Sequence, residues 1–226
     1  MDRFVDAGGV RLACRVTGDE TAPPLVMLHA LAQDGSAWAG PARRLAGRYR
    51  VYAPDLRGHG ASDRCPEYSF ELMRDDVLAL LDELGLERVT LFGHSMGAIV
   101  AYLVAGDHPE RVSRLVLEEP PPPVRADPPR TVPADHDASE PYDWAMVAAV
   151  YRQRNDPDPS YWDRLSAITA PTLIIAGGAG SHLPQEEMAR MAGLIPDCHL
   201  ITIEAGHLVH EHRPEEFAAA VDAFVT

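Results

Sequence analysis

The chain has 226 residues, of which 46% are hydrophobic and 24% are charged, and its formal net charge is -14 at pH 7. This length and composition suit one well-buried globular domain, and no apolar run reaches the roughly 18 residues that a membrane helix needs. A surface this acidic repels nucleic acid and anionic lipid, so the charge argues against both as partners, and it says little about a neutral small-molecule substrate.

Short apolar runs alternate with helical patterns along the chain. Residues 4–16 predict an antiparallel hairpin that turns at Gly8 and Gly9. A helix is predicted over 73–84, and another begins at Pro214. Buried strands are predicted at residues 25–29, 50–53, 88–92, 114–117, 172–176 and 199–203. Runs this apolar are typical of parallel strands covered on both faces, so we expect an α/β fold with a mostly parallel, doubly wound sheet.

One segment interrupts this alternation. Residues 120–171 separate two predicted strands by 52 residues and hold 11 of the 20 prolines, which is far beyond a normal loop. Within it, Trp144, Val147 and Tyr151 share a helical face. The insertion leaves from the C-terminal edge of a strand, where open α/β sheets bind ligands. We therefore expect a cap over residues 120–171 whose three side chains contact the substrate or pack the cap onto the core, with a surface loop as the alternative. The core domain would be residues 1–119 and 172–226.

Residues 93–97 read Gly-His-Ser-Met-Gly, directly after a predicted strand and before the helical stretch 98–105. This is the G-x-S-x-G pattern in the strand–turn–helix context that it requires. A serine at such a tight turn needs small residues two positions away on either side, and the N-terminus of the following helix directs free N–H groups at the reacting carbon. The pattern predicts that Ser95 is a nucleophile.

A nucleophilic serine needs a general base. His207 follows the last predicted strand and precedes the final helix, so it is expected at the same edge of the sheet as Ser95. His210 and His212 follow it closely. This spacing of three histidines lacks an accompanying cysteine or carboxylate cluster, so no metal site is expected, and we interpret His210 and His212 as supporting or solvated residues.

Two backbone N–H groups complete the predicted chemistry, one just after the strand predicted at 25–29 and one directly after Ser95. Those of Leu31 and Met96 are placed to form an oxyanion hole, in which developing negative charge is stabilised. The side chain of His29 also lies at this edge, as a candidate substrate contact or, more in keeping with its position, a structural hydrogen-bonding group.

Four stretches together resemble the α/β-hydrolase superfamily over essentially the whole chain: residues 28–31, 55–62, 93–97, and 205–207 with 213–217. The resemblance implies the α/β-hydrolase fold, hydrolysis of an ester, lactone, thioester or carbon–carbon bond, and no cofactor. The serine at position 95 argues against relatives that use an aspartate nucleophile, such as dehalogenases and epoxide hydrolases. Ala30 departs from the glycine that the family usually has there.

The acid is the more serious departure from the family pattern. The family usually carries its acid about four residues before a proline in the loop after the penultimate strand. In this chain Gly180 occupies that place, and no carboxylate precedes Glu186 in the loop. Either the triad is incomplete or the acid comes from another element.

Glu118 and Glu119 end the strand predicted at 114–117, and some relatives take their acid from the end of this strand. Adjacent strand side chains point to opposite faces, so only one of the two glutamates can readily reach His207. Matching the strand to the family pattern places Glu119 at the acid site. The alternatives are that both are ordinary strand-end charges, or that an aspartate of the insertion serves: Asp143, Asp156 or Asp158.

We therefore expect a serine esterase or lactonase that acts on a small, largely apolar substrate through a Ser95–His207–Glu119 triad. Two hypotheses stay open beside it. The absent family acid motivates a ligand-binding homologue with little turnover, and the same pocket would suit a biosynthetic relative that cyclises or decarboxylates a metabolite. The sequence does not specify the oligomeric state.

The cysteines and the N-terminus bear on location. Cys14, Cys65 and Cys198 are scattered, odd in number and without C-x-x-C spacing, which favours free thiols over a disulfide framework. Residues 1–14 alternate like a strand and lack the apolar stretch of a signal peptide. A cytoplasmic location is therefore expected.

Overall fold

The computed structural model describes residues 2–132, 137 and 139–225. They form an eight-stranded sheet in the order β1-β2-β4-β3-β5-β6-β7-β8. β1 and β2 make the antiparallel hairpin expected at the start, and β2 is antiparallel to β4. The remaining strands, β4, β3, β5, β6, β7 and β8 in sheet order, are parallel to one another. The strands are β1 (Asp2–Asp6), β2 (Arg11–Thr17), β3 (Pro24–Leu28), β4 (Arg50–Pro54), β5 (Val89–His94), β6 (Val112–Glu118), β7 (Thr172–Ala176) and β8 (Cys198–Thr202).

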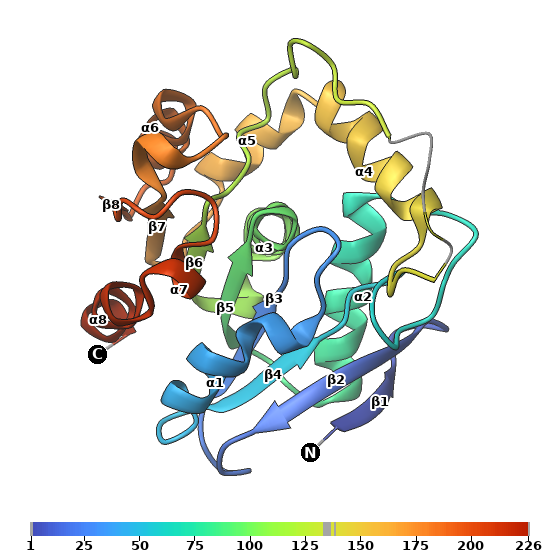
Figure 1. The fold of residues 1–226 in the computed structure, drawn as a ribbon. Helices are drawn as coiled ribbons and strands as arrows, with labels where there is room; N and C mark the ends of the chain where they lie inside the picture. The colour runs from blue at the N-terminus through green and yellow to red at the C-terminus, as the bar shows by residue number, and fades with distance from the viewer. Residues whose placement is uncertain (1, 133–136, 138, 226) are drawn as a thin grey trace.

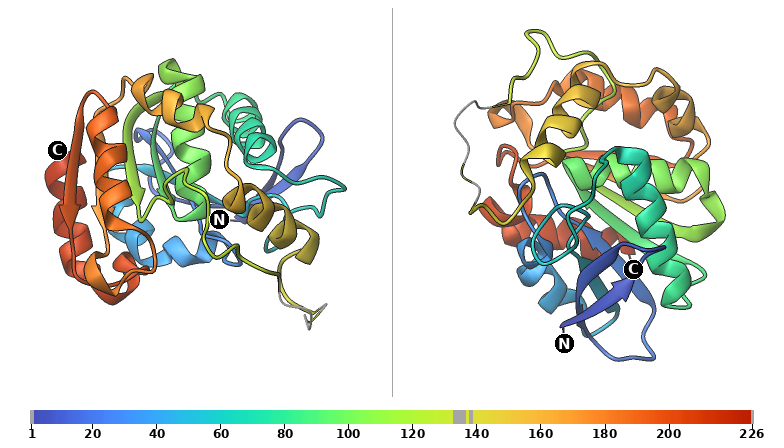
Figure 2. Two further views of the ribbon diagram at one scale, coloured as in Figure 1. Left: turned by 90° about the horizontal axis from the view of Figure 1, so that it is seen from above. Right: turned by 90° about the vertical axis from the view of Figure 1, so that its right-hand side faces the viewer.

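Helices cover both faces of this sheet (Figures 1 and 2). α1 and α8 contact one another on one face, whereas α2, α3 and α6 lie on the other. The helical elements are η1 (Gly35–Trp38), α1 (Ala39–Leu45), α2 (Phe70–Glu83), α3 (Met96–Asp107), η2 (Pro109–Arg111), α4 (Trp144–Asn155), α5 (Ser160–Ser166), η3 (Gly178–Gly180), α6 (Gln185–Leu194), α7 (Val209–His212) and α8 (Pro214–Val225). The predicted mostly parallel, doubly wound α/β fold is confirmed.

Alternation along the central strands explains the two layers. In β3, Leu25 and Met27 join the cluster under α1 and α8, whereas Val26 and Leu28 join the cluster under α2 and α3. Side chains of a strand point to its two faces in turn, so a strand covered on both faces must be apolar throughout. All six residues of β5, which leads to Ser95, are buried.

The proline-rich segment contains α4 and α5. Val147 and Val150 of α4, and Leu165 of α5, belong to the same buried cluster as α3, and α5 contacts α3 and α6. Figure 1 shows α4 and α5 along the edge of the sheet where its parallel strands end. The division into a core and a cap over residues 120–171 stays a prediction.

No helix within the described residues is both long enough and apolar enough to cross a membrane. The three cysteines are free. Burial raises the pKa of the Cys14 thiol to about 12, so Cys14 is a protonated, packed side chain at neutral pH.

Candidate active site

Ser95 occupies a tight turn between β5 and α3. Its φ is 51°, a conformation that non-glycine residues seldom adopt, and its backbone N–H donates to the carbonyl oxygen of Glu118 at 3.0 Å. A Cβ at position 93 would lie 2.4 Å from the carbonyl oxygen of Gly97, and one at position 97 would lie 2.3 Å from that of Leu28. Only glycine fits at both places, which is the physical reason for the G-x-S-x-G spacing.

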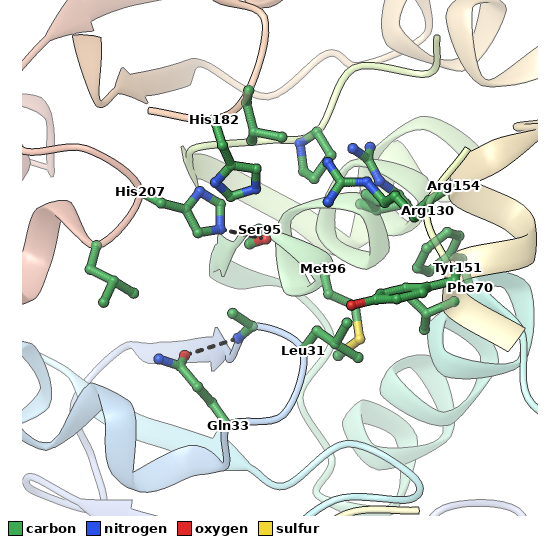
Figure 3. Close-up of a pocket in the computed structure, with 16 residues that line it drawn as sticks. Leu31, Gln33, Phe70, Ser95, Met96, Arg130, Tyr151, Arg154, His182 and His207 are labelled. Carbon is green, nitrogen blue, oxygen red and sulfur yellow. Dashed lines mark hydrogen bonds between the residues drawn. The ribbon is translucent and has the colours of Figure 1, made fainter. Parts of the chain in front are cut away.

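Three predicted residues meet where β5, β6 and β8 end. The hydroxyl of Ser95 lies 2.9 Å from Nε2 of His207, and Nδ1 of His207 lies 3.1 Å from a carboxylate oxygen of Glu119 (Figure 3 shows the Ser95–His207 pair). The arrangement is consistent with Nδ1–H of His207 donating to Glu119, and with Nε2 accepting from Ser95. The structure thus brings Ser95, His207 and Glu119 into one chain of hydrogen bonds, although they are far apart in the sequence.

Glu119 is fully buried, and its φ of 47° turns the backbone sharply after β6. The N–H of Gly177 donates to its Oε1 at 2.5 Å, and the hydroxyl of Ser181 donates to its Oε2. Burial alone raises the pKa of Glu119, but its hydrogen bonds with His207, Ser181 and Gly177 outweigh burial and hold that pKa below its ordinary value of 4.5. Glu119 is therefore a carboxylate at neutral pH.

His94 of the elbow positions the backbone of His207. It is fully buried, and its Nε2 lies 2.8 Å from the carbonyl oxygen of His207, to which it donates. His94 is thus a buried residue that contacts the backbone of His207. On the other side, the ring of His182 lies 4.3 Å from the ring of His207.

A cavity of about 250 Å³ opens at Ser95 and His207. Leu31 and Met96, whose N–H groups were predicted to form the oxyanion hole, both line it beside Ser95. Met96 is the first residue of α3, so its N–H lies at the positive end of the helix dipole. Much of the remaining wall is apolar and includes Phe70, Ile99, Val150 and Leu183.

Tyr151, one of the four candidate substrate contacts, lines this cavity, whereas the other three have the structural roles that the sequence left open as the alternative. His29 is fully buried, and its two ring nitrogens bond the backbone of Ala30 at 2.8 Å and of Leu56 at 2.9 Å. Val147 is buried in the core cluster, against which Trp144 packs. Of the three residues predicted to share a face of α4, Trp144 and Val147 near its N-terminus pack onto the core, and only Tyr151, nearer its C-terminus, reaches the cavity.

Three residues at the site were not predicted from the sequence: two arginines on the cavity wall and a serine that binds Glu119. Arg130 and Arg154 line the cavity, and Ser181 holds Glu119. Arg154 follows Val150 and Tyr151 at helical spacing, so extending the predicted face by one turn would have found it. Arg130 lies outside any helix or strand and has no comparable signal.

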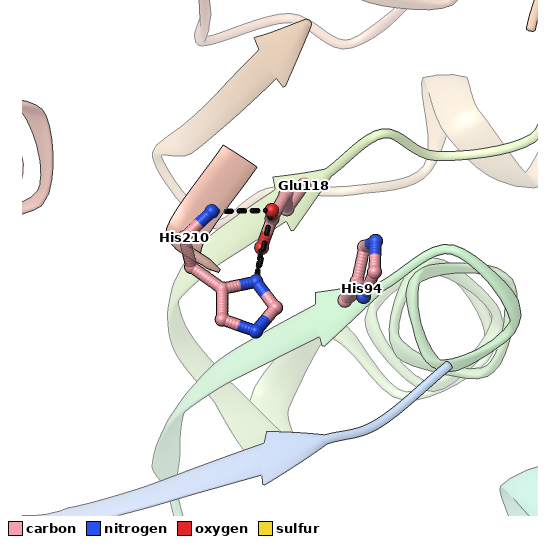
Figure 4. Close-up of side chains that lie close together, drawn as sticks. All are labelled: His94, Glu118 and His210. Carbon is pink, nitrogen blue, oxygen red and sulfur yellow. Dashed lines mark hydrogen bonds and ion pairs between the residues drawn. The ribbon is translucent and has the colours of Figure 1, made fainter. Parts of the chain in front are cut away.

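A second buried group lies beneath the site (Figure 4). Glu118 contacts Nδ1 of His210 at 2.7 Å and accepts the backbone N–H of His210 at 2.9 Å, and both side chains are almost fully buried. Ligand atoms of His94, Glu118 and His210 lie within 4.8 Å of one another. Because Glu118 and His210 already touch, no ion fits between these two atoms, and we interpret the contact as an ion pair.

Comparison with known proteins finds a matching family model and similar hydrolases. The family model described as alpha/beta hydrolase fold matches residues 23–164. The sn-1-specific diacylglycerol lipase of Mus musculus is 28% identical over 92% of this chain and 82% of its own. A solved hydrolase from Pseudomonas aeruginosa is 26% identical, with a TM-score of 0.88, over 99% of this chain and 98% of its own. A thermophilic esterase from Thermogutta terrifontis is 26% identical, with a TM-score of 0.84, over 100% and 98%. Three mycobacterial relatives, by contrast, match over only 33% of their own length.

Proposed function

The chain belongs to the alpha/beta hydrolase fold family, and from that membership we propose that it is a serine hydrolase that cleaves a small ester, lactone or related acyl bond. The observation that carries the proposal is the chain of hydrogen bonds from the Ser95 hydroxyl through His207 to Glu119. This is the arrangement in which a serine hydroxyl becomes a competent nucleophile at neutral pH.

Each of the three hydrogen-bonded residues then has a defined role in the reaction. As the Ser95 oxygen attacks the acyl carbon, its proton passes to Nε2 of His207. Glu119, a buried carboxylate, fixes the ring of His207 and stabilises the imidazolium that forms. His207 then gives the proton to the leaving group, which departs and leaves an acyl group on Ser95. Water, deprotonated by the same nitrogen, releases the acid and regenerates the serine.

The N–H groups of Leu31 and Met96 are proposed to stabilise the oxyanion of the tetrahedral intermediate. Both residues line the cavity beside Ser95, and Met96 begins α3. Donors already held in place by the fold cost little reorganisation when charge develops, and the loss of one such donor typically slows a reaction by about 10²–10³-fold.

Two features support acyl hydrolysis over ligand capture. The ligand-binding hypothesis was motivated by the absent acid at Gly180, but Glu119 lies within hydrogen-bond distance of His207. The mouse relative is named a lipase and the Thermogutta relative an esterase. The small volume of the cavity, about 250 Å³, favours a short acyl group.

Covalent labelling combined with turnover tests this proposal. We expect a fluorophosphonate probe to label wild-type protein at Ser95, and short-chain 4-nitrophenyl esters to be hydrolysed. Ser95→Ala should abolish labelling and lower kcat by roughly 10⁴-fold or more, and His207→Ala by a similar factor, because the two residues act as a unit. Circular dichroism of each variant serves as the folding control. Turnover by Ser95→Ala within tenfold of wild type would refute the mechanism.

A further inference from the structure

Two arginines stand together on the wall of the cavity. Arg154 comes from the last turn of α4, and Arg130 precedes that helix in the chain and belongs to no helix or strand. Asn155 ties them together, because the backbone N–H of Arg130 donates to its Oδ1 and its Nδ2 donates to the carbonyl oxygen of Arg130, both at 2.8 Å. Figure 3 shows the two side chains on the same side of the cavity as His182, across from Gln33.

Neither guanidinium has a carboxylate partner among the described residues. Nη1 of Arg154 donates to the carbonyl oxygen of Pro122 at 3.3 Å, whereas Nε of Arg130 is buried without a hydrogen-bond partner. The buried Arg57 makes an instructive contrast, because Asp76 binds it through two oxygens, each at 2.5 Å. The chain has 34 acidic and 20 basic residues, so a shortage of carboxylates does not explain why this pair lacks one.

Two adjacent positive charges in a partly buried wall are unfavourable unless an anion joins them. Burial and the positive charge of Arg130 lower the pKa of Arg154 to about 10, so Arg154 still carries its charge at neutral pH. A negative group placed between them would remove the repulsion and satisfy the free donors. Arginine is suited to this role because its planar fork of N–H groups matches the two oxygens of a carboxylate.

We propose that the substrate carries a carboxylate, which binds Arg130 and Arg154 while its scissile acyl carbon lies at Ser95. This inference rests on the proposed serine hydrolase function and narrows its substrate class. Apolar side chains, among them Phe70 and Ile99, provide a surface for the hydrocarbon that joins the two ends. The substrate is then a short acyl compound with an anionic end and is no longer the largely apolar molecule expected from the sequence.

The test compares matched pairs of esters. The 4-nitrophenyl hemiesters of succinic, glutaric and adipic acid are each measured beside the neutral 4-nitrophenyl ester of the same acyl length, after spontaneous hydrolysis is subtracted. Each pair shares its leaving group and chain and differs at the terminal carboxylate. A hydrogen bond to a charged group contributes about 1.5–3 kcal/mol, so for at least one length we expect kcat/KM to favour the hemiester by roughly ten- to hundredfold.

Variants of the two arginines then test whether they cause the preference for the hemiester. Arg154→Met and Arg130→Met should each lower kcat/KM for the preferred hemiester at least tenfold more than for its neutral partner. Arg152→Met is the matched control, because Arg152 is an exposed residue of the same helix that does not line the cavity, and it should leave the ratio unchanged. The proposal is overturned if no hemiester is preferred, or if both cavity variants keep the wild-type ratio.

Labelling of Ser95 separates this failure from failure of the proposed function. A neutral fluorophosphonate reports the reactivity of Ser95 without a carboxylate. If Ser95 is labelled and neutral esters turn over without any preference for hemiesters, only the carboxylate proposal falls. If Ser95 is not labelled and no ester turns over in folded protein, both proposals fall.

Discussion

Glu118 and Glu119 are neighbours in the chain, yet they hold two different histidines: Glu118 contacts His210 at 2.7 Å and Glu119 contacts His207 at 3.1 Å. Glu118 is the last residue of β6, whereas Glu119 follows the strand with a φ of 47°, and this turn directs its side chain to a different histidine. The end of β6 and the residue after it thereby supply one carboxylate to His207 and another to the buried ion pair with His210.

The ion pair of Glu118 and His210 should make stability depend on pH. Burial lowers the pKa of His210, but the hydrogen bond and charge of Glu118 outweigh it and raise that pKa above 6.5. Burial raises the pKa of Glu118, but the neighbouring His94 and the bonds from His210 outweigh it and bring that pKa below 4.5. The contribution of His210 is complete below pH 6.5 and is lost as pH rises through its raised pKa. That of Glu118 is present above pH 4.5 and is lost as pH falls through its lowered pKa.

Glu118→Gln should therefore destabilise the protein most between about pH 4.5 and 6.5, by about 3–5 kcal/mol, the usual effect of breaking a buried pair. The measurement is the free energy of unfolding by urea across pH 4 to 9. The control is Glu216→Gln, because Glu216 forms an exposed pair with Arg213 that contributes less than about 1 kcal/mol. A difference between wild type and Glu118→Gln that stays constant over the whole range would contradict the charge-based account.

Ser181 should act as a positioning residue for Glu119. Its hydroxyl donates to the carboxylate oxygen that also faces His207. Ser181→Ala removes one of the bonds that lower the pKa of Glu119, so that pKa should rise and the loss of activity on acidification should begin at a higher pH. We expect kcat to fall roughly tenfold, as for the loss of one hydrogen bond of about 1.5 kcal/mol. Ser181→Thr, which keeps the hydroxyl, should restore the wild-type pH profile; a Ser181→Ala enzyme with an unshifted profile would remove Ser181 from the site.

Much of the site could be predicted because parallel strands end at one edge. Ser95, Glu119 and His207 each follow a strand that runs in the same direction, so strand order alone brought them to the same region. Alternation predicted that only one of Glu118 and Glu119 reaches His207, and in the structure the turn at Glu119, just after β6, directs the two side chains apart. The prediction of Ser95 and His207 used the periodicity of apolar residues and the turn at Gly93 and Gly97, whereas the choice of Glu119 also used the resemblance to the α/β-hydrolase pattern.

The remaining features depend on tertiary contacts that leave little trace in the sequence. His29 follows a strand at the right edge and was expected to form structural hydrogen bonds, but its partner, the N–H of Leu56, is 27 positions away and no local pattern indicates it. Ser181 reaches Glu119 across 62 positions. Arg130 lies in a stretch without periodicity, and the two hydrogen bonds that join its backbone to Asn155 are contacts that the sequence pattern does not indicate.

Tyr151 and Val147 of α4 should differ in what their loss affects. Tyr151 lines the cavity, so Tyr151→Ala should change KM and the preference for acyl length with little effect on unfolding. Val147 is buried in the core cluster, so Val147→Ala should lower the free energy of unfolding by roughly 1–3 kcal/mol and leave the ratio of rates on short and long esters unchanged. Urea unfolding and a series of 4-nitrophenyl esters measure both effects. A reversed outcome would mean that α4 presents a different face to the substrate.

The role of Glu119 as the acid is tested by removing its carboxylate and then introducing one at position 180. Glu119→Gln keeps the shape of the side chain and removes its charge, so it should lower kcat by roughly 10⁴-fold, the effect of the equivalent loss in other triads. A near-normal kcat would mean that a Ser95–His207 dyad suffices. Gly180 is the place where the family usually carries the acid, and a Cβ there would meet only ordinary contacts, at 3.5 Å from Gly206, the residue before His207.

Gly180→Asp in the Glu119→Gln background should therefore fold and recover part of the lost kcat, because a carboxylate would again be available to the ring of His207. Gly180→Asn in the same background is the matched control: it has the same shape without the charge, and it should recover nothing. The recovery is measured as kcat on one 4-nitrophenyl ester, with thermal unfolding as the check on folding. Equal rates for the Asp and Asn variants would show that position 180 cannot supply the acid in this chain, and that the turn at Glu119 is the only one of the two places from which His207 can be held.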